Sequence, residues 1–392
     1  MAHGGHCVAR YDGRVVFVRH ALPGERVRVV VTDGSDGSSF WRADAVDVLD
    51  ASPDRVAPPC PWAGPGRCGG CDWQHASVAA QRALKTAVVR EQLSRLAGIE
   101  SDVEVAAVPG DEAGLAWRTR VSWAVDDDGT PGLRRHRSHQ VVPVDSCRIA
   151  HPLVDAAGVT GRSWPGVSSV EVAASPSTGQ VLVLPDGRGQ GELTEVVGER
   201  AYRVSGSGFW QVHPGAATVL LDAVLAGLGA GPGDTVLDLY GGAGLFAAAL
   251  AGRVAPGGQV TLVESDQVAV ADARHNLAGL PGVRVERGRV DHVLRRLRLG
   301  RADLVVLDPP RSGAGKTVVD LLARRVRPRR IAYVACDPAA LARDLRWFAE
   351  RGYRMTGLRA FDLFPMTHHV ECVAVLEPAT RQDGAPPVPA GG

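Results

Sequence analysis

The distribution of apolar residues divides the chain into three sections. In the first, runs rich in valine and aromatic residues at 15–18, 27–31 and 41–48 alternate with turns rich in glycine, proline and serine, which is typical of short β-strands. Four or five such strands in about 55 residues predict a small, OB-like β-barrel, a fold that often binds oligonucleotides. The alternative is a barrel that only docks onto its own protein.

The second section mixes a helix with several strands. It contains four of the seven cysteines, a predicted helix over 77–96, and strand-like runs around 117–120 and 141–144. Between these runs lies the basic stretch Leu133–His139. That stretch is either a solvated hairpin tip or a tip that contacts phosphates. The section is therefore expected to be an α+β domain.

In the third section, strand and helix patterns alternate, which predicts a parallel sheet covered by helices. Helices are expected at 266–279 and 316–326, and the final strands at 353–361 and 370–376 predict a closing antiparallel hairpin. The five earlier strands are expected at 235–239, 260–264, 283–286, 304–307 and 331–335. The fold class is thus α/β, and the predicted boundaries are 1–56, 57–204 and 205–378, followed by a disordered tail over 379–392.

Composition narrows the class of protein without naming a ligand. The 392 residues are 45% hydrophobic and 22% charged, with a net charge of +1, which neither favours nor excludes a nucleic-acid partner. Only Lys85 and Lys316 are lysines, against 42 arginines. The chain shows no apolar run of about 18 residues and no signal peptide pattern. We therefore expect a soluble, cytoplasmic, multi-domain protein that is a monomer and has no membrane partner.

A glycine-rich turn follows the first strand of the third section. The run 236–246 reads VLDLYGGAGLF, and Glu264 ends the next strand 20 residues after Gly244. Such a turn lets the backbone approach a cofactor closely, and the acidic residue is placed to bind ribose hydroxyls. The arrangement serves both dinucleotides and S-adenosylmethionine. The turn alone leaves hydride transfer and methyl transfer open.

Two further motifs lie at the carboxyl ends of predicted parallel strands. Asp308-Pro309-Pro310 follows the fourth strand, and Asp308 is expected to face the ligand crevice. Arg311 occupies the place where enzymes that methylate exocyclic amines often carry an aromatic residue, which disfavours that reaction. Cys336 ends the fifth strand just before a predicted helix, where unpaired amides and the helix dipole would stabilise a thiolate.

A thiolate suits methylation at C5 of uracil. That carbon is a poor nucleophile until a thiolate adds to C6 and turns C5 into an enolate carbon. A base must then remove the C5 proton so that the thiol can leave. Glu371, at the start of the last strand, is the candidate base.

The cysteines of the second section indicate a metal site. Cys60, Cys68, Cys71 and Cys147 together supply four thiolates, enough for zinc or an iron–sulfur cluster. Zinc sites more often use two Cys-x-x-Cys pairs, so the spacing leans toward iron–sulfur. A redox disulfide between Cys68 and Cys71 is the weaker alternative.

These motifs together resemble the RNA (uracil-5-)-methyltransferase family. The run 9–18 with 22–25 is similar to a TRAM domain, an RNA-binding barrel, and the cysteine pattern resembles members that carry a [4Fe–4S] cluster. The remaining similarity lies in the runs 209–213, 307–313, 336–344 and 362–365. The resemblance implies a class I, Rossmann-like methyltransferase domain preceded by the barrel and the iron–sulfur domain.

The resemblance also implies site residues, with Cys336 as nucleophile and Glu371 as base. The implied contacts to S-adenosylmethionine are Gln211, Tyr240, Glu264 and Asp308, and the implied cluster ligands are Cys60, Cys68, Cys71 and Cys147.

The expected product is 5-methyluridine in RNA. The favoured substrate is 23S ribosomal RNA, with transfer RNA as the alternative. Two other readings are an NAD-binding oxidoreductase and, because of Leu245 and Arg289, a catalytically inactive RNA-binding protein.

Overall fold

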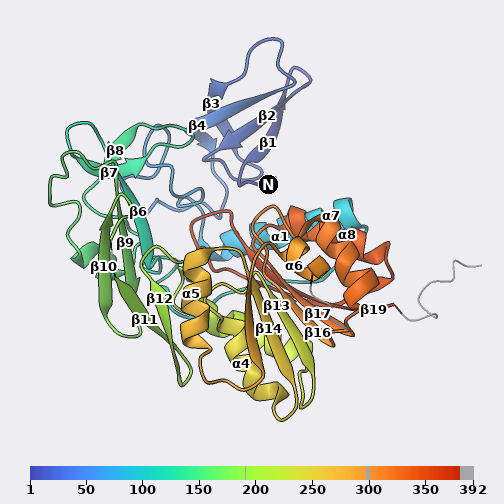
Figure 1. The fold of residues 1–392 in the computed structure, drawn as a ribbon. Coiled ribbons are helices and arrows are strands. Elements are labelled where there is room, and N and C mark those ends of the chain that lie inside the picture. Colours follow the sequence, from blue (N-terminus) through green and yellow to red (C-terminus); the bar gives the residue numbers. More distant parts are fainter. Residues whose placement is uncertain (190, 297–300, 380–392) are drawn as a thin grey trace, which may run out of the picture. The chain divides into compact units, whose positions relative to one another are not determined.

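The computed structural model describes residues 1–189, 191–296 and 301–379, which form two compact units (Figure 1). The first unit consists of Met1–Glu91, Glu104–Thr218 and Phe361–Val370, and the second of Gln92–Val103, Val219–Ala360 and the chain from Glu371 onward. The predicted boundaries after residues 56 and 204 stay predictions. Of the predicted tail, residues 380–392 lie outside the described residues.

The N-terminal part of the first unit is a four-stranded sheet. Its order is β1-β2-β4-β3, with β2 and β4 parallel and the other neighbours antiparallel. Val16, Val18 and Ala43 are buried on one face because alternate side chains of a strand point the same way. The strands are β1 (Cys7–Tyr11), β2 (Arg14–Arg19), β3 (Arg26–Asp33) and β4 (Phe40–Asp50). The runs predicted at 15–18, 27–31 and 41–48 correspond to β2, β3 and β4, whereas β1 was not located from the sequence.

The remainder of the first unit mixes helices and antiparallel strands, as the sequence predicted. A five-stranded sheet of order β10-β9-β6-β7-β8 packs Trp123, Val170 and Val172 into its core. Strands β11 and β12 form a separate hairpin. The elements are α1 (Val78–Ala97), β5 (Val105–Ala106), β6 (Arg120–Val125), β7 (Pro131–Arg134), β8 (Val141–Pro143), α2 (Pro152–Ala156), β9 (Ser169–Ser175), β10 (Gln180–Pro185), β11 (Glu192–Val197) and β12 (Arg200–Ser205).

The second unit is built on a largely parallel sheet. Its strands follow the order β15-β14-β13-β16-β17-β19-β18; the first five are parallel, and β19 runs antiparallel to β17. The strands are β13 (Thr235–Leu239), β14 (Gln259–Glu264), β15 (Val283–Arg287), β16 (Leu304–Leu307), β17 (Arg330–Ala335), β18 (Tyr353–Phe361) and β19 (Glu371–Pro378). Parallel strands that alternate with helices confirm the predicted α/β fold.

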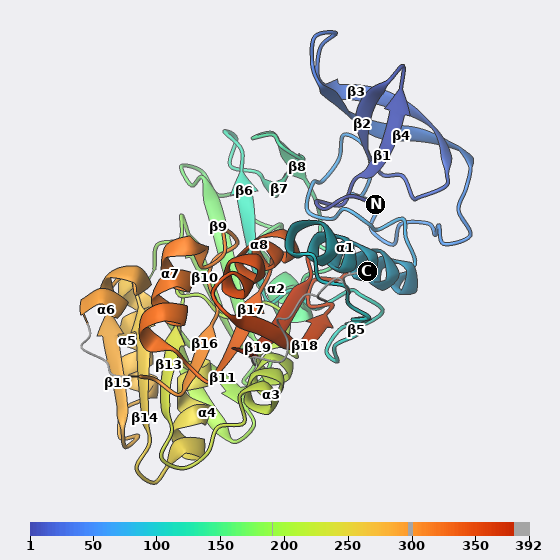
Figure 2. The ribbon, with the colours of Figure 1, turned by 90° about the vertical axis from the view of Figure 1, so that its right-hand side faces the viewer.

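Helices cover both faces of this sheet, with α3 and α4 on the opposite side from α7 and α8 (Figure 2). Residues of β13 and β16 are buried along nearly their whole length because both faces are covered. The helices are α3 (Ala216–Leu228), α4 (Leu245–Val254), α5 (Gln267–Asn276), α6 (Val290–Arg296), α7 (Gly315–Leu321), which continues into a π-helical turn (Leu322–Val326), and α8 (Pro338–Ala349). The strand order reverses between β13 and β16, so a ligand crevice is expected at their carboxyl ends.

Among the described residues, no helix has the length and apolar character needed to cross a membrane.

Candidate active site

A sharp turn carries the chain from β13 into α4. Tyr240 has a φ of 63°, and the N–H groups of Tyr240 and Gly241 both donate to the carbonyl of Val263, at 2.9 and 3.2 Å. A Cβ at Gly241 would lie 2.5 Å from Cγ of Leu262, so only glycine fits there. The turn therefore lies tightly over the carboxyl ends of β13 and β14.

Three carboxyl groups gather at this edge of the sheet. Glu264 accepts hydrogen bonds from the N–H of Gly242 at 3.1 Å and from that of Asp266 at 2.8 Å. Asp238 is fully buried, and its Oδ1 has no hydrogen-bond partner among the described residues. Burial raises the pKa of Asp238 to about 7, and burial with the charges of Asp238 and Glu264 raises that of Asp308 to about 7. Such a site favours a ligand that brings positive charge or hydroxyl donors.

A pocket of about 430 Å³ opens beside the turn, within the second unit. Arg289 and Asp291 both line the pocket, and Oδ1 of Asp291 lies 3.2 Å from Nε of Arg289. The lining consists of Tyr240, Ser265, Arg289, Val290, Asp291, Ala314, Gly315, Lys316, Thr317 and Val318.

Cys336 and Glu371 lie at the junction of β17 and β19. The antiparallel register pairs Ala335 with Cys372, and continuing it by one residue sets Glu371 opposite Cys336. Opposite residues of an antiparallel pair have Cβ atoms about 5 Å apart. Asp337 then caps α8, its carboxylate accepting the N–H of Ala340 at 2.8 Å. Strand pairing therefore brings together two residues that are far apart in the sequence.

The electrostatics of this pair differ from the expectation of a stabilised thiolate. Burial, followed by the charge of Glu371, raises the pKa of Cys336 to about 12, with smaller contributions from Asp308 and Asp337. Burial and Asp308 hold the pKa of Glu371 well above its ordinary value. Arg311 opposes both shifts, a role that the sequence reasoning missed. The expected lowering of the thiol pKa is wrong for the free protein, because burial and nearby carboxylates raise it.

The four cysteines of the predicted metal site line one cavity of about 100 Å³ in the first unit. The amide of Gln74 donates to Sγ of Cys71 at 3.3 Å, and all four thiols are free rather than paired in disulfides. Within the described ranges, no group of three or more His, Cys, Asp or Glu residues is arranged as a single metal-ion site. The structure thus places the predicted ligands around a common space, and their binding of a cluster stays a prediction.

The predicted cofactor contacts divide between the two units. Tyr240, Glu264 and Asp308 lie at the carboxyl edge of the second unit's sheet, and Tyr240 lines its pocket. Gln211 belongs to the first unit; it lies in the chain segment that connects β12 to α3, and its side chain is half-buried. The roles assigned to these residues stay predictions.

Comparison with known proteins shows the family. Residues 177–379 match the family described as tRNA (Uracil-5-)-methyltransferase, and residues 2–42 match the TRAM domain. An RNA methyltransferase of Streptomyces avermitilis, described as uncharacterized, is 52% identical, with 97% of each chain covered. A protein of Bifidobacterium longum with the same description is 38% identical, covering 95% of this chain and 94% of its own.

A solved structure shares the fold. It is the tRNA (uracil-54, C5)-methyltransferase of Pyrococcus abyssi in complex with S-adenosyl-L-homocysteine, with a TM-score of 0.70 and 23% identity, covering 95% of this chain and 100% of that one. Together with the family match, this decides the choice between methyl and hydride transfer that the glycine turn left open. The chain belongs to the tRNA (uracil-5-)-methyltransferase family and is an S-adenosylmethionine-dependent RNA methyltransferase with an N-terminal TRAM domain.

Proposed function

We propose that this enzyme methylates C5 of a uridine through a covalent bond between Sγ of Cys336 and C6 of the base. The observation that carries the proposal is the register of β17 and β19, which sets a buried carboxyl group, Glu371, opposite a half-buried thiol. A nucleophile and a base are both required, and strand pairing holds them side by side.

Each group has one task in the proposed sequence. The Cys336 thiolate adds to C6, and the electrons of the C5–C6 double bond move to make C5 nucleophilic. Bound S-adenosylmethionine supplies the methyl group that C5 accepts. Glu371 then removes the C5 proton, and the electron pair left behind re-forms the double bond and expels the thiolate.

The raised pKa values fit this order of events. A buried carboxylate whose pKa is high is a strong base once it is charged, which suits removal of a proton from carbon. The resting thiol is protonated, so it must be activated when substrates bind. The charge of Arg311 favours the thiolate, and Arg311 follows Asp308 in the same loop.

We favour 23S ribosomal RNA as the substrate, with transfer RNA as the alternative. The combination of a TRAM domain with the four cysteines supports this choice.

The N-terminal sheet carries a surface suited to unpaired bases of either RNA. Tyr11 is 67% exposed and stacks on Trp41 with ring centroids 6.2 Å apart, and the Arg14 guanidinium lies 4.3 Å over the indole of Trp41. Mapping 5-methyluridine in ribosomal and transfer RNA from a deletion strain identifies the substrate.

We further propose that Cys60, Cys68, Cys71 and Cys147 bind a [4Fe–4S] cluster. A set of four thiols around one cavity is the donor set that such clusters use, and burial raises the pKa of Cys147 to about 11, so a cationic group is needed to hold it as thiolate. Protein purified without oxygen should be brown and contain about four irons per chain. Stoichiometric zinc without iron would contradict this assignment.

Variants of the two reacting residues test the mechanism because their failures differ. Cys336→Ala should form neither product nor any covalent species with RNA. Glu371→Gln should add and methylate but not eliminate, so that ordinary uridine RNA stays attached to Cys336. Glu377→Gln, on the same strand and paired with Arg330, is the matched control and should turn over normally. Methylation by Cys336→Ala at a rate near that of the wild type would refute the mechanism.

A further inference from the structure

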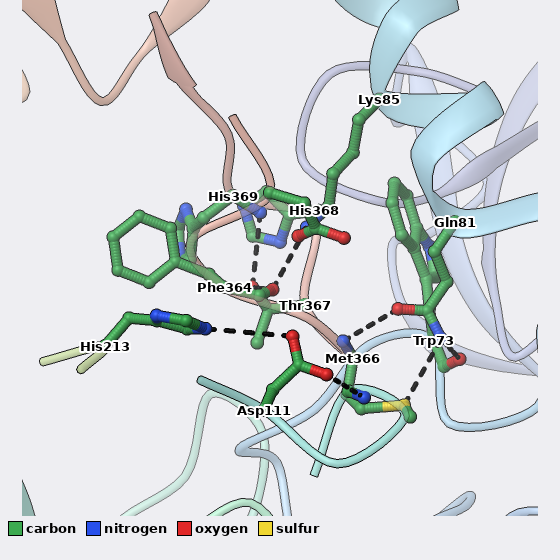
Figure 3. Close-up of polar contacts among 12 residues, drawn as sticks. Trp73, Gln81, Lys85, Asp111, His213, Phe364, Met366, Thr367, His368 and His369 are labelled. Carbon is green, nitrogen blue, oxygen red and sulfur yellow. Dashed lines mark hydrogen bonds and ion pairs between the residues drawn. The ribbon is translucent and has the colours of Figure 1, made fainter. Parts of the chain in front are cut away.

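The chain segment that leads into Glu371 is fixed by buried polar contacts. This segment, Phe361–Val370, belongs to the first unit and includes Met366, whose φ is 66°. Figure 3 shows side chains from α1 reaching it, together with residues near the cysteines. Backbone carbonyls and N–H groups buried in this way need partners, so the residues that supply them determine its conformation.

Lys85 supplies the first of these contacts. Its side chain is fully buried, and Nζ donates to Oδ1 of Asp362 at 2.5 Å and to the carbonyl of Phe364 at 3.0 Å. Burial lowers the pKa of Lys85, and the carboxylate of Asp362 opposes that shift. In a chain with 42 arginines, a lysine stands here. The compact ammonium of lysine fits between the carboxylate of Asp362 and the carbonyl of Phe364, whereas the larger planar guanidinium of arginine would not fit as well.

Gln81, one helical turn before Lys85, supplies the second contact. Its Oε1 accepts the N–H of Met366 at 2.7 Å, and its Nε2 donates to the carbonyls of Trp73 and Ala76 at 3.1 and 2.9 Å (Figure 3). The side chain has no exposed surface. One amide therefore joins the segment 361–370 to the loop that follows the Cys68–Cys71 pair.

That loop contacts the segment directly as well. The N–H groups of Asp72 and Trp73 both donate to the carbonyl of Met366, at 2.9 and 3.0 Å. The carboxylate of Asp72 lies 2.6 Å from Nδ1 of His368 and accepts that residue's N–H at 3.1 Å. Asp72 follows Cys71 immediately in the chain. The cysteine-bearing loop and α1 thus both bind the backbone of Met366 in the segment 361–370.

We propose that Lys85 and Gln81 are positioning residues for proton removal by Glu371; this inference rests on the proposed role of Glu371 as the base. Val370 is the last residue of the segment 361–370, so the contacts that fix this segment also fix the direction in which the backbone enters Glu371. Cys336 lies at the end of β17, which is also paired with β16, and the contacts of Lys85 and Gln81 described above involve no residue of β17. Loss of Lys85 therefore slows elimination and leaves addition to C6 unchanged.

The experiment compares two reactions of Lys85→Met. Adduct formation with 5-fluorouridine RNA requires addition and methyl transfer but no removal of a C5 proton. Product release from ordinary uridine RNA requires that removal. We expect the first rate to stay within about twofold of the wild type and the second to fall at least about tenfold, a loss typical of a misplaced general base, with methylated RNA accumulating on Cys336.

Three further variants separate positioning from stability. The double variant Lys85→Met/Asp362→Leu removes both charges, which restores stability in many buried pairs, but it should keep the elimination defect. Gln81→Leu removes both the acceptor for the N–H of Met366 and the donor to Trp73 and Ala76, and it should show the same defect. Arg55→Met breaks a partly buried ion pair of the first unit, with Glu25 at 2.5 Å, and should change neither rate selectively.

The outcomes distinguish failure of the positioning role of Lys85 and Gln81 from failure of the proposed covalent mechanism. Equal loss of both rates in the double variant and in Gln81→Leu, or no loss in either, overturns the positioning role. Failure of the wild type to form any adduct with 5-fluorouridine RNA overturns the proposed function instead.

Discussion

Iodoacetamide should alkylate Cys336 of the free enzyme far more slowly than it alkylates N-acetylcysteine at pH 7.5. The pKa of Cys336 is raised from 9.0 to about 12, so its thiolate population near neutral pH is lower by about 1000-fold. A more basic thiolate is more nucleophilic, and for a shift of this size each thiolate reacts about 16- to 32-fold faster. The net expectation is a rate roughly 30- to 60-fold lower.

The shape of the pH–rate profile separates this effect from poor access of the reagent. Access scales the rate equally at every pH, whereas a raised pKa makes the rate rise about tenfold per pH unit up to at least about pH 10, where an ordinary thiol has levelled off. Mass spectrometry can follow Cys336 alone, because cleavage after arginine releases the peptide 331–343, whose only cysteine is Cys336.

Glu371→Gln provides the internal check. Removing that carboxylate removes the largest charge contribution to the raised thiol pKa, so the profile of Cys336 should level off at lower pH than in the wild type. A profile that levels off below about pH 9 in the wild type would refute the electrostatic reading, as would an unchanged profile in the variant. Rapid alkylation at neutral pH would restore the original expectation of a thiolate stabilised by the helix terminus.

Three other changes give distinct expectations. Gly241→Ala places a Cβ 2.5 Å from Leu262 and should cost about 1–3 kcal/mol with loss of S-adenosylmethionine binding by calorimetry, whereas Gly252→Ala, with open space, should stabilise by up to about 1 kcal/mol. Burial raises the pKa of Glu195 to about 7, so the folded state holds this proton more tightly than the unfolded state and the free energy of unfolding falls as pH rises from about 4.5 to 7. Denaturant titrations should show that the fall over this pH range is smaller by roughly 3 kcal/mol in Glu195→Gln. Trp41→Ala should weaken RNA binding by about 1–3 kcal/mol in a fluorescence titration, and unchanged affinity would exclude base stacking there.

Much of the second unit could be predicted from the sequence because the responsible interactions are local. The strands expected at 235–239, 304–307 and 353–361 have those bounds in the structure, since apolar runs between turn residues define buried strands directly. The glycine turn after β13 was also visible, because only glycine satisfies the close approach at Gly241. Chemistry could be inferred wherever one residue type at a strand end carries it, as with Cys336.

The tertiary structure decided what depends on distant segments. Strand β19 lies between β17 and β18, and this non-sequential order, which no local pattern encodes, sets Glu371 opposite Cys336. The thiol pKa follows from burial and from carboxylates on other strands, so a rule based on the helix terminus alone gave the wrong sign. Lys85 lies within the helix predicted over 77–96, and its partner Asp362 lies 277 residues further along the chain. Burial and long-range charge pairing arise only when the chain is folded, which is why the sequence indicated the candidate reacting groups but not what surrounds them.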